Sequence, residues 1–199
     1  MKLVSILIAI LLSGCVSTTS RLQEMHEAVI RLQNRQARGY GSGVAISPRR
    51  ILSAAHLCMD SQSLYSDQFD MQLKVIAADA VSDLCLLQAD QDVFTSYATV
   101  ALDSPTYESV VGMGYRMGHF WVSSPGYLLP DLINRDRPLV LTTVLGGGPG
   151  VSGGALFLAD TYPLVLAGIL VAAIREPDAR VIVVPSSTIV KFLTLNRGY

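Results

Sequence analysis

The most informative stretch of the 199-residue sequence is Gly148-Pro149-Gly150-Val151-Ser152-Gly153-Gly154-Ala155-Leu156. It sets one serine among glycines, which tolerate backbone angles that other residues avoid and let another molecule approach the main chain closely. The amide N–H groups of Gly150 and Ser152 can therefore converge on a developing oxyanion, as acyl transfer to a serine requires. Taken alone, the motif leaves two interpretations open: a nucleophilic serine or an ordinary glycine-rich turn.

Nearer the N-terminus, His56 ends the segment Leu52-Ser53-Ala54-Ala55-His56. Histidine is the usual general base at neutral pH because its ordinary pKa lies close to neutrality. The small side chains of Ala54 and Ala55 let the backbone pack tightly behind the imidazole. A single histidine is more often structural than catalytic, so this segment indicates catalysis only in combination with the other motifs.

Between these two segments, Asp83 opens the apolar run Leu84-Cys85-Leu86-Leu87. The ordinary interpretation is a charged strand end in solvent. The functional interpretation is a carboxylate that accepts a hydrogen bond from the histidine ring and fixes its tautomer. Asp79 is a rival for this role, but no apolar strand follows it directly.

The remainder of the sequence predicts an all-β protein. About a dozen short strand-like runs separated by turn residues are typical of a sandwich or barrel. At the end of the chain, Pro185-Ser186-Ser187 can begin a short helix. Half of the residues are hydrophobic and 16% are charged, which excludes an intrinsically disordered chain. The net charge of -1 disfavours a general nucleic-acid binder, so we expect no nucleic-acid partner.

In the order His56, Asp83, Ser152, the three motifs resemble the trypsin/chymotrypsin-like serine proteases. The nearest resemblance is to short bacterial proteases and the protease domains of Deg-type periplasmic proteases, and it spans residues 28–193, including the run Gly41-Ser42-Gly43-Val44-Ala45-Ile46-Ser47. It implies two six-stranded antiparallel β-barrels, at about 28–95 and 106–185, joined by a linker near 96–105 and followed by a short C-terminal helix. The catalytic groups would lie in the cleft between the barrels.

The resemblance also implies a role for each residue of the site. Ser152 would be the nucleophile, His56 the general base and Asp83 the orienting acid, and the amides of Gly150 and Ser152 would form the oxyanion hole. The implied function is a serine endopeptidase that acts on proteins or peptides through an acyl-enzyme, with no cofactor and no metal. Two alternatives remain: a catalytically inert binding or scaffold protein on a protease fold, and an esterase, for which the residue order differs from the Ser, Asp, His order of α/β-hydrolases.

The sequence departs from the family pattern before the serine. Val151 stands where trypsin-type zymogens have an aspartate that pairs with a newly cut N-terminus, so we expect no trypsin-style activation. No PDZ module follows, so Deg-like cage assembly is not implied. By the family pattern the base of the specificity pocket is Gly146, and the strand containing Ala172 and Ala173 flanks it. With no acid at the base and alanines on the wall, we expect small to medium apolar substrate side chains.

The first residues have the features of an export signal. A positive start and an apolar run too short to span a membrane lead to Leu12-Ser13-Gly14-Cys15, which resembles the bacterial lipobox. We therefore expect a signal peptide at 1–14, a lipidated N-terminus and tether at 15–27, and a protease domain at 28–199. Val16 is not an aspartate, which favours the periplasmic face of the outer membrane. The alternative is an ordinary signal peptide with a chance cysteine.

Two cysteines remain after Cys15, and they are Cys58 and Cys85, each two residues beyond a proposed catalytic residue. If His56 and Asp83 touch, their neighbours Cys58 and Cys85 come within the separation that a disulfide needs. An exported compartment favours the oxidised form. The alternative is two unpaired, buried thiols.

Overall fold

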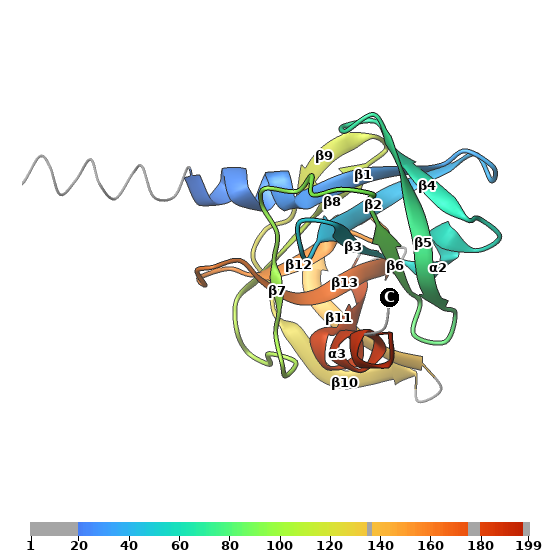
Figure 1. Ribbon diagram of the computed structural model, residues 1–199. Helices are drawn as coiled ribbons and strands as arrows, with labels where there is room; N and C mark the ends of the chain where they lie inside the picture. Colours follow the sequence, from blue (N-terminus) through green and yellow to red (C-terminus); the bar gives the residue numbers. More distant parts are fainter. Residues whose placement is uncertain (1–19, 135–136, 175–179, 197–199) are drawn as a thin grey trace, which may run out of the picture.

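The computed structural model describes residues 20–134, 137–174 and 180–196, so the predicted signal peptide and Cys15 lie outside the described residues. Two sets of strands lie beside each other, and a helix at 20–28 leads into the first of them (Figure 1). Within the described ranges, no helix combines the length and the apolar character that crossing a membrane requires.

The first set of strands is a closed antiparallel barrel. Its order is β1-β2-β3-β6-β5-β4. The strands are β1 (Val29–Asn34), β2 (Gly39–Ala45), β3 (Arg50–Ser53), β4 (Ser63–Ser66), β5 (Met71–Asp79) and β6 (Leu84–Gln88). Successive side chains of a strand point to opposite faces, so Ile30 and Leu32 of β1 both point into the barrel. There they pack in one cluster with Leu73 and Leu87. Between β3 and β4 the chain forms the short helix α2 (Ala55–Cys58).

The second set is an eight-stranded sheet whose main path is β10-β11-β14-β13-β12-β8-β9. Its strands are β7 (Thr99–Val100), β8 (Val110–Arg116), β9 (His119–Val122), β10 (Leu128–Asn134), β11 (Arg137–Leu145), β12 (Ala155–Leu158), β13 (Val165–Ala173) and β14 (Arg180–Pro185). The predicted second six-stranded barrel is therefore a half-barrel: in the described chain no ladder joins β9 to β10. The segment between β9 and β10 instead contacts β8, through an isolated bridge from Gly126 to Val110. The all-β class and the C-terminal helix, α3 (Ser186–Leu195), are confirmed.

The segment at 96–105, expected to be a linker, contains β7. Hydrogen bonds join Thr99 N to Leu164 O at 2.9 Å and Ala101 N to Leu166 O at 3.0 Å, so β7 runs parallel to β13. The amide of Ala98 donates to Ala45 O on the first barrel at 2.9 Å. The connection therefore attaches both strand sets to each other instead of spanning them loosely.

Three apolar clusters form the core. One fills the first barrel, and one lies inside the second sheet. The third lies between them and combines barrel residues such as Leu52 and Leu86 with Met113 and Phe157 of the second sheet, together with Phe192 of α3. Because this third cluster is shared, it holds the ends of β3, β6 and β12 in one region, where the predicted catalytic residues are found.

Candidate active site

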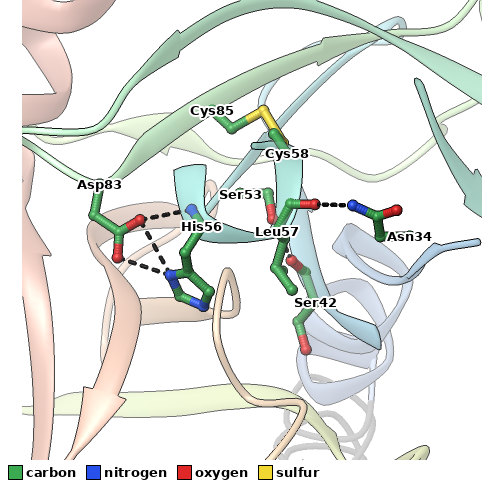
Figure 2. Close-up of a disulfide and its surroundings, with 8 residues drawn as sticks. All are labelled: Asn34, Ser42, Ser53, His56, Leu57, Cys58, Asp83 and Cys85. Atoms are coloured by element: carbon green, nitrogen blue, oxygen red, sulfur yellow. Dashed lines mark hydrogen bonds and ion pairs between the residues drawn. A yellow bond between two sulfur atoms is a disulfide. The ribbon is translucent and has the colours of Figure 1, made fainter. Parts of the chain in front are cut away.

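His56 and Asp83 form a hydrogen-bonded pair on the first barrel (Figure 2). The ring Nδ1 of His56 lies 2.9 Å from Asp83 Oδ2 and 3.1 Å from Oδ1. A carboxylate only accepts, so Nδ1 carries the proton, and in the neutral ring Nε2 keeps its lone pair. Asp83 Oδ1 also accepts the main-chain N–H of His56 at 2.9 Å. The carboxylate thus fixes both the ring and the start of the helix that bears it.

The position of Asp83 follows from the turn between β5 and β6. Asp83 has φ of 54°, a left-handed conformation that aspartate adopts more readily than most residues. The rival acid Asp79 builds this turn: its carboxylate accepts the Ser82 hydroxyl at 2.5 Å and the Val81 N–H at 3.0 Å. The hydrogen bond from the Ser82 side chain lowers the pKa of Asp79. Asp79 therefore supports the turn, and Asp83 is the acid that contacts His56.

A disulfide joins the two segments that carry this pair. Cys58 on α2 and Cys85 on β6 are bonded, with their Cα atoms 6.5 Å apart. Each cysteine lies two residues after a member of the pair, as Figure 2 shows. At its other side, α2 is held by buried Asn34, whose side-chain amide donates to Leu57 O at 2.8 Å. The histidine is therefore carried by a helix that is fixed at several points.

The loop that carries Ser152 depends on glycine at two positions. Gly150 and Gly153 have φ of 91° and 84°, which L side chains rarely adopt. A β-carbon on Gly150 would lie 2.4 Å from Tyr115 O, and one on Gly153 would lie 2.0 Å from Ser42 O. The loop can approach β2 and β8 this closely only because no side chain intervenes.

Ser42, on β2, connects the serine loop to the first barrel. Its buried hydroxyl donates to Gly150 O at 2.8 Å and accepts the N–H of Tyr115 at 2.7 Å. Its own main-chain N–H donates to Ser152 O at 2.8 Å. In the sequence, Ser42 is only part of a family-like run with no predicted role, because a serine between glycines has the same pattern as a turn.

Two amides of the loop remain available for an oxyanion. In the described part of the chain, neither Gly150 N–H nor Ser152 N–H donates a hydrogen bond, whereas Val151 N–H bonds Gly148 O at 3.1 Å. The carbonyl of Pro149 accepts Met117 N–H at 2.8 Å. In a planar trans peptide the C=O of one residue and the N–H of the next point in opposite directions. The N–H of Gly150 therefore points away from Met117, which bonds the Pro149 carbonyl.

The hydroxyl of Ser152 donates to Val171 O on β13 at 3.2 Å. Across the described residues, no hydrogen bond joins it to His56. Catalytic hydrogen bonds are often long or misaligned in unliganded enzymes and tighten when substrate binds. The structure thus places the serine on the second sheet and the histidine–aspartate pair on the first barrel, as expected for a site built between them.

A pocket of about 550 Å³ opens beside Ser152. Ala172 and Ala173, predicted to contact substrate, line it. Gly146 is not among the lining residues: it has φ of 87° and a β-carbon there would face Trp121, so Gly147 and Gly148 form the wall instead. Arg116, at the end of β8, also lines the pocket, although no sequence motif pointed to it.

Among the residues that the structure describes, no group of three or more His, Cys, Asp or Glu side chains is placed to hold a metal ion.

The closed barrel and the half-barrel beside it form the fold of the trypsin-like serine proteases, and the predicted chymotrypsin-like architecture is confirmed. The chain is similar to the inactive form of the protease Rv3671c, with a TM-score of 0.70 and 19% identity over 88% of this chain and 92% of that one. It is also similar to an inactive serine-to-alanine mutant of Rv3671c from M. tuberculosis H37Rv, with a TM-score of 0.68 and 19% identity over 86% and 87%.

A third similar structure is the serine endoprotease from Yersinia pestis, with a TM-score of 0.67 and 20% identity. That likeness covers 85% of this chain and 62% of the Yersinia chain. No protein-family model and no curated protein sequence matches the chain. At identities of 19–20% these likenesses establish the fold, and the chemistry has to be argued from the site itself.

The first test concerns Ser42. Ser42→Ala leaves Gly150 O and Tyr115 N–H without their partner, so we expect the stability to fall by about 1–3 kcal/mol. Because the serine loop also loses its attachment to β2, reaction of Ser152 with a fluorophosphonate should slow by about 10- to 100-fold. Urea unfolding and labelling kinetics measure the two effects separately.

Ser53→Ala is the matched control. The buried Ser53 hydroxyl donates to Ser42 O at 2.7 Å and makes no hydrogen bond to the serine loop. It should lower stability while labelling stays within about threefold of wild type, since the hydrogen bonds to the loop persist. Equal slowing in the two variants would contradict a specific role for Ser42.

The second test concerns the disulfide. Its cysteines are 27 residues apart, and closing a loop of this length stabilises a protein by about 3–4 kcal/mol through the unfolded state. The double variant Cys58→Ala/Cys85→Ala should lose about that much in urea unfolding. Reductant should destabilise wild type to the same level and leave the double variant unchanged. Insensitivity of wild type to reductant would show that the bond contributes little.

Proposed function

We propose that the protein is a serine endopeptidase in which Ser152, His56 and Asp83 act as a catalytic triad. The observation that carries the proposal is the bidentate contact between Asp83 and His56 Nδ1, which leaves Nε2 as the ring's basic atom. A carboxylate in this position fixes the tautomer that a general base needs. The side chain of His56 is 45% exposed and that of Asp83 15%, so the base is accessible while its orienting acid is shielded.

On this proposal Ser152 Oγ attacks the peptide carbonyl carbon, and its proton passes to His56 Nε2. The carbonyl oxygen becomes an oxyanion that the N–H groups of Gly150 and Ser152 stabilise. Collapse of this intermediate breaks the C–N bond, and His56 gives its proton to the leaving amine. Water then repeats the sequence on the acyl-enzyme, releasing the acid and restoring Ser152.

The open edge of β13 supports substrate binding as an added strand. β12 pairs with β13 only from Leu166 to Ile169, whereas β14 pairs as far as Ala173 on the other side. Among the described residues, no strand pairs with 171–173 on the side next to Ser152, so an extended peptide could form main-chain hydrogen bonds there. A substrate N–H that bonds Val171 O would replace the Ser152 hydroxyl there and free it for His56.

Active-site labelling tests the proposal. The full chain, purified in detergent, is treated with a fluorophosphonate near pH 8, together with Ser152→Ala and His56→Ala. We expect labelling of wild type at Ser152 only, and peptidase activity at least about 10⁴-fold lower in both variants. Ser96→Ala, which removes a half-buried serine that bonds Glu27, is the matched control and should label like wild type.

The alternatives give different results in the same experiment. Rapid hydrolysis of small esters with no cleavage of any peptide would favour the esterase. A folded wild-type protein that takes up no label would overturn the enzymatic proposal and favour the binding or scaffold function.

We propose further that the protein is exported and anchored through lipidated Cys15, with the periplasmic face of the outer membrane as its place. The support is the lipobox-like Leu12-Ser13-Gly14-Cys15. Lipoproteins carry several acyl chains at this cysteine, and two or more chains give stable membrane attachment.

Cys15→Ser tests this anchor. Wild type expressed in a bacterial host should incorporate radiolabelled palmitate and sediment with the outer membrane, whereas the variant should do neither. Incorporation of palmitate by the variant would contradict acylation at Cys15. A wild-type protein that is cleaved, soluble and free of palmitate would indicate an ordinary signal peptide.

A further inference from the structure

Of the described residues that line the pocket beside Ser152, Arg116 is the charged one. The pocket wall is otherwise formed by glycines, Pro149, Ser152 itself and apolar side chains, including Leu170, Ile174 and Val181. Among the residues that the structure describes, no acidic residue lines the pocket and Arg116 makes no ion pair. Two arginines of the first barrel do form ion pairs: Arg31 with Asp67, and Arg49 with Asp92.

The side chain of Arg116 lies along the pocket wall, beside the main chain of Gly148. A β-carbon on Gly148 would come within 2.9 Å of its Nε and 3.5 Å of its Cδ. The absence of a side chain at position 148 therefore allows the arginine to lie against the main chain only four residues before Ser152. Arg116 is an exposed residue, so the N–H donors of its guanidinium are accessible to a bound ligand.

An apolar wall with one cation suits a side chain that is apolar along its stem and anionic at its tip. The methylenes of glutamate would contact Ala172, Ala173 and Val181, and its carboxylate would meet the Arg116 guanidinium, which binds carboxylates bidentately. A lysine or arginine in the same pocket would bring a second positive charge to Arg116 with no acid to offset it, which disfavours basic substrates.

We infer that this pocket receives an acidic side chain, glutamate above all, on the acyl side of the bond that is cleaved, and that Arg116 determines this specificity. The inference rests on the proposed protease function. It refines the sequence-based expectation of small to medium apolar side chains, because the apolar walls remain and the cation adds a requirement at the rim.

Matched peptide p-nitroanilides that differ only in the residue before the scissile bond test the inference. With the full chain in detergent, the Glu substrate should be cleaved with kcat/KM about 10- to 100-fold above that of Ala and further above that of Lys. Arg116→Ala should lower the ratio of kcat/KM for the Glu substrate to that for the Ala substrate to about one or below. Arg116→Glu should reverse the preference toward Lys, and Arg116→Lys should restore part of the preference for Glu.

Arg49→Ala is the matched control because it removes an arginine of the first barrel that lines no part of the pocket, and its substrate preference should equal that of wild type. Fluorophosphonate labelling separates the two proposals. If Arg116→Ala labels normally and loses the preference for Glu, the inference holds. If wild type labels and cleaves peptides but prefers Ala, or if Arg116→Ala keeps the preference for Glu, the inference is overturned while the protease function stands. If wild type neither labels nor cleaves, both fail.

Discussion

The Ser42 hydroxyl joins three parts of the molecule, in addition to main-chain hydrogen bonds such as that from Ser42 N–H to Ser152 O. It lies on the first barrel, donates to the carbonyl of Gly150 in the serine loop, and accepts the amide of Tyr115 on β8. Because it is buried, no water can substitute for either partner at low cost. The backbone geometry around Ser152 therefore depends on a residue 110 positions earlier in the chain, on the opposite side of the site.

The two halves of the site are held by different kinds of bond. His56 and Asp83 lie on segments joined by a covalent link, and the turn before Asp83 is further supported by Asp79. Ser152 lies on a loop held by hydrogen bonds to main-chain atoms and by close glycine contacts. His56 and Asp83 are therefore held together by several bonds, whereas Ser152, the proposed nucleophile, lies on a loop and its hydroxyl donates to Val171 O on β13.

Much of this arrangement could be predicted from short motifs, because their residue types have strong local meanings. The glycines around Ser152, the apolar strand after Asp83 and the all-β pattern each reflect constraints that act within a few residues. Ser42 and Arg116 were missed because their roles come from partners more than 30 residues away in sequence. The open second sheet was missed for a related reason: strand closure depends on pairing between β9 and β10, which no local pattern determines.

The unpaired edge of β13 has a consequence for what such an enzyme could cut. A segment that adds to this edge must be extended over several residues, and its own main-chain donors and acceptors must be free. In a folded target those groups are already used by helices and sheets, so cleavage would wait for local opening. When opening is fast compared with cleavage, the rate follows the free energy of that opening. If the proposed function is correct, both the sequence and the stability of a target protein would determine whether it is cleaved. Proteins with low local stability would be cleaved first.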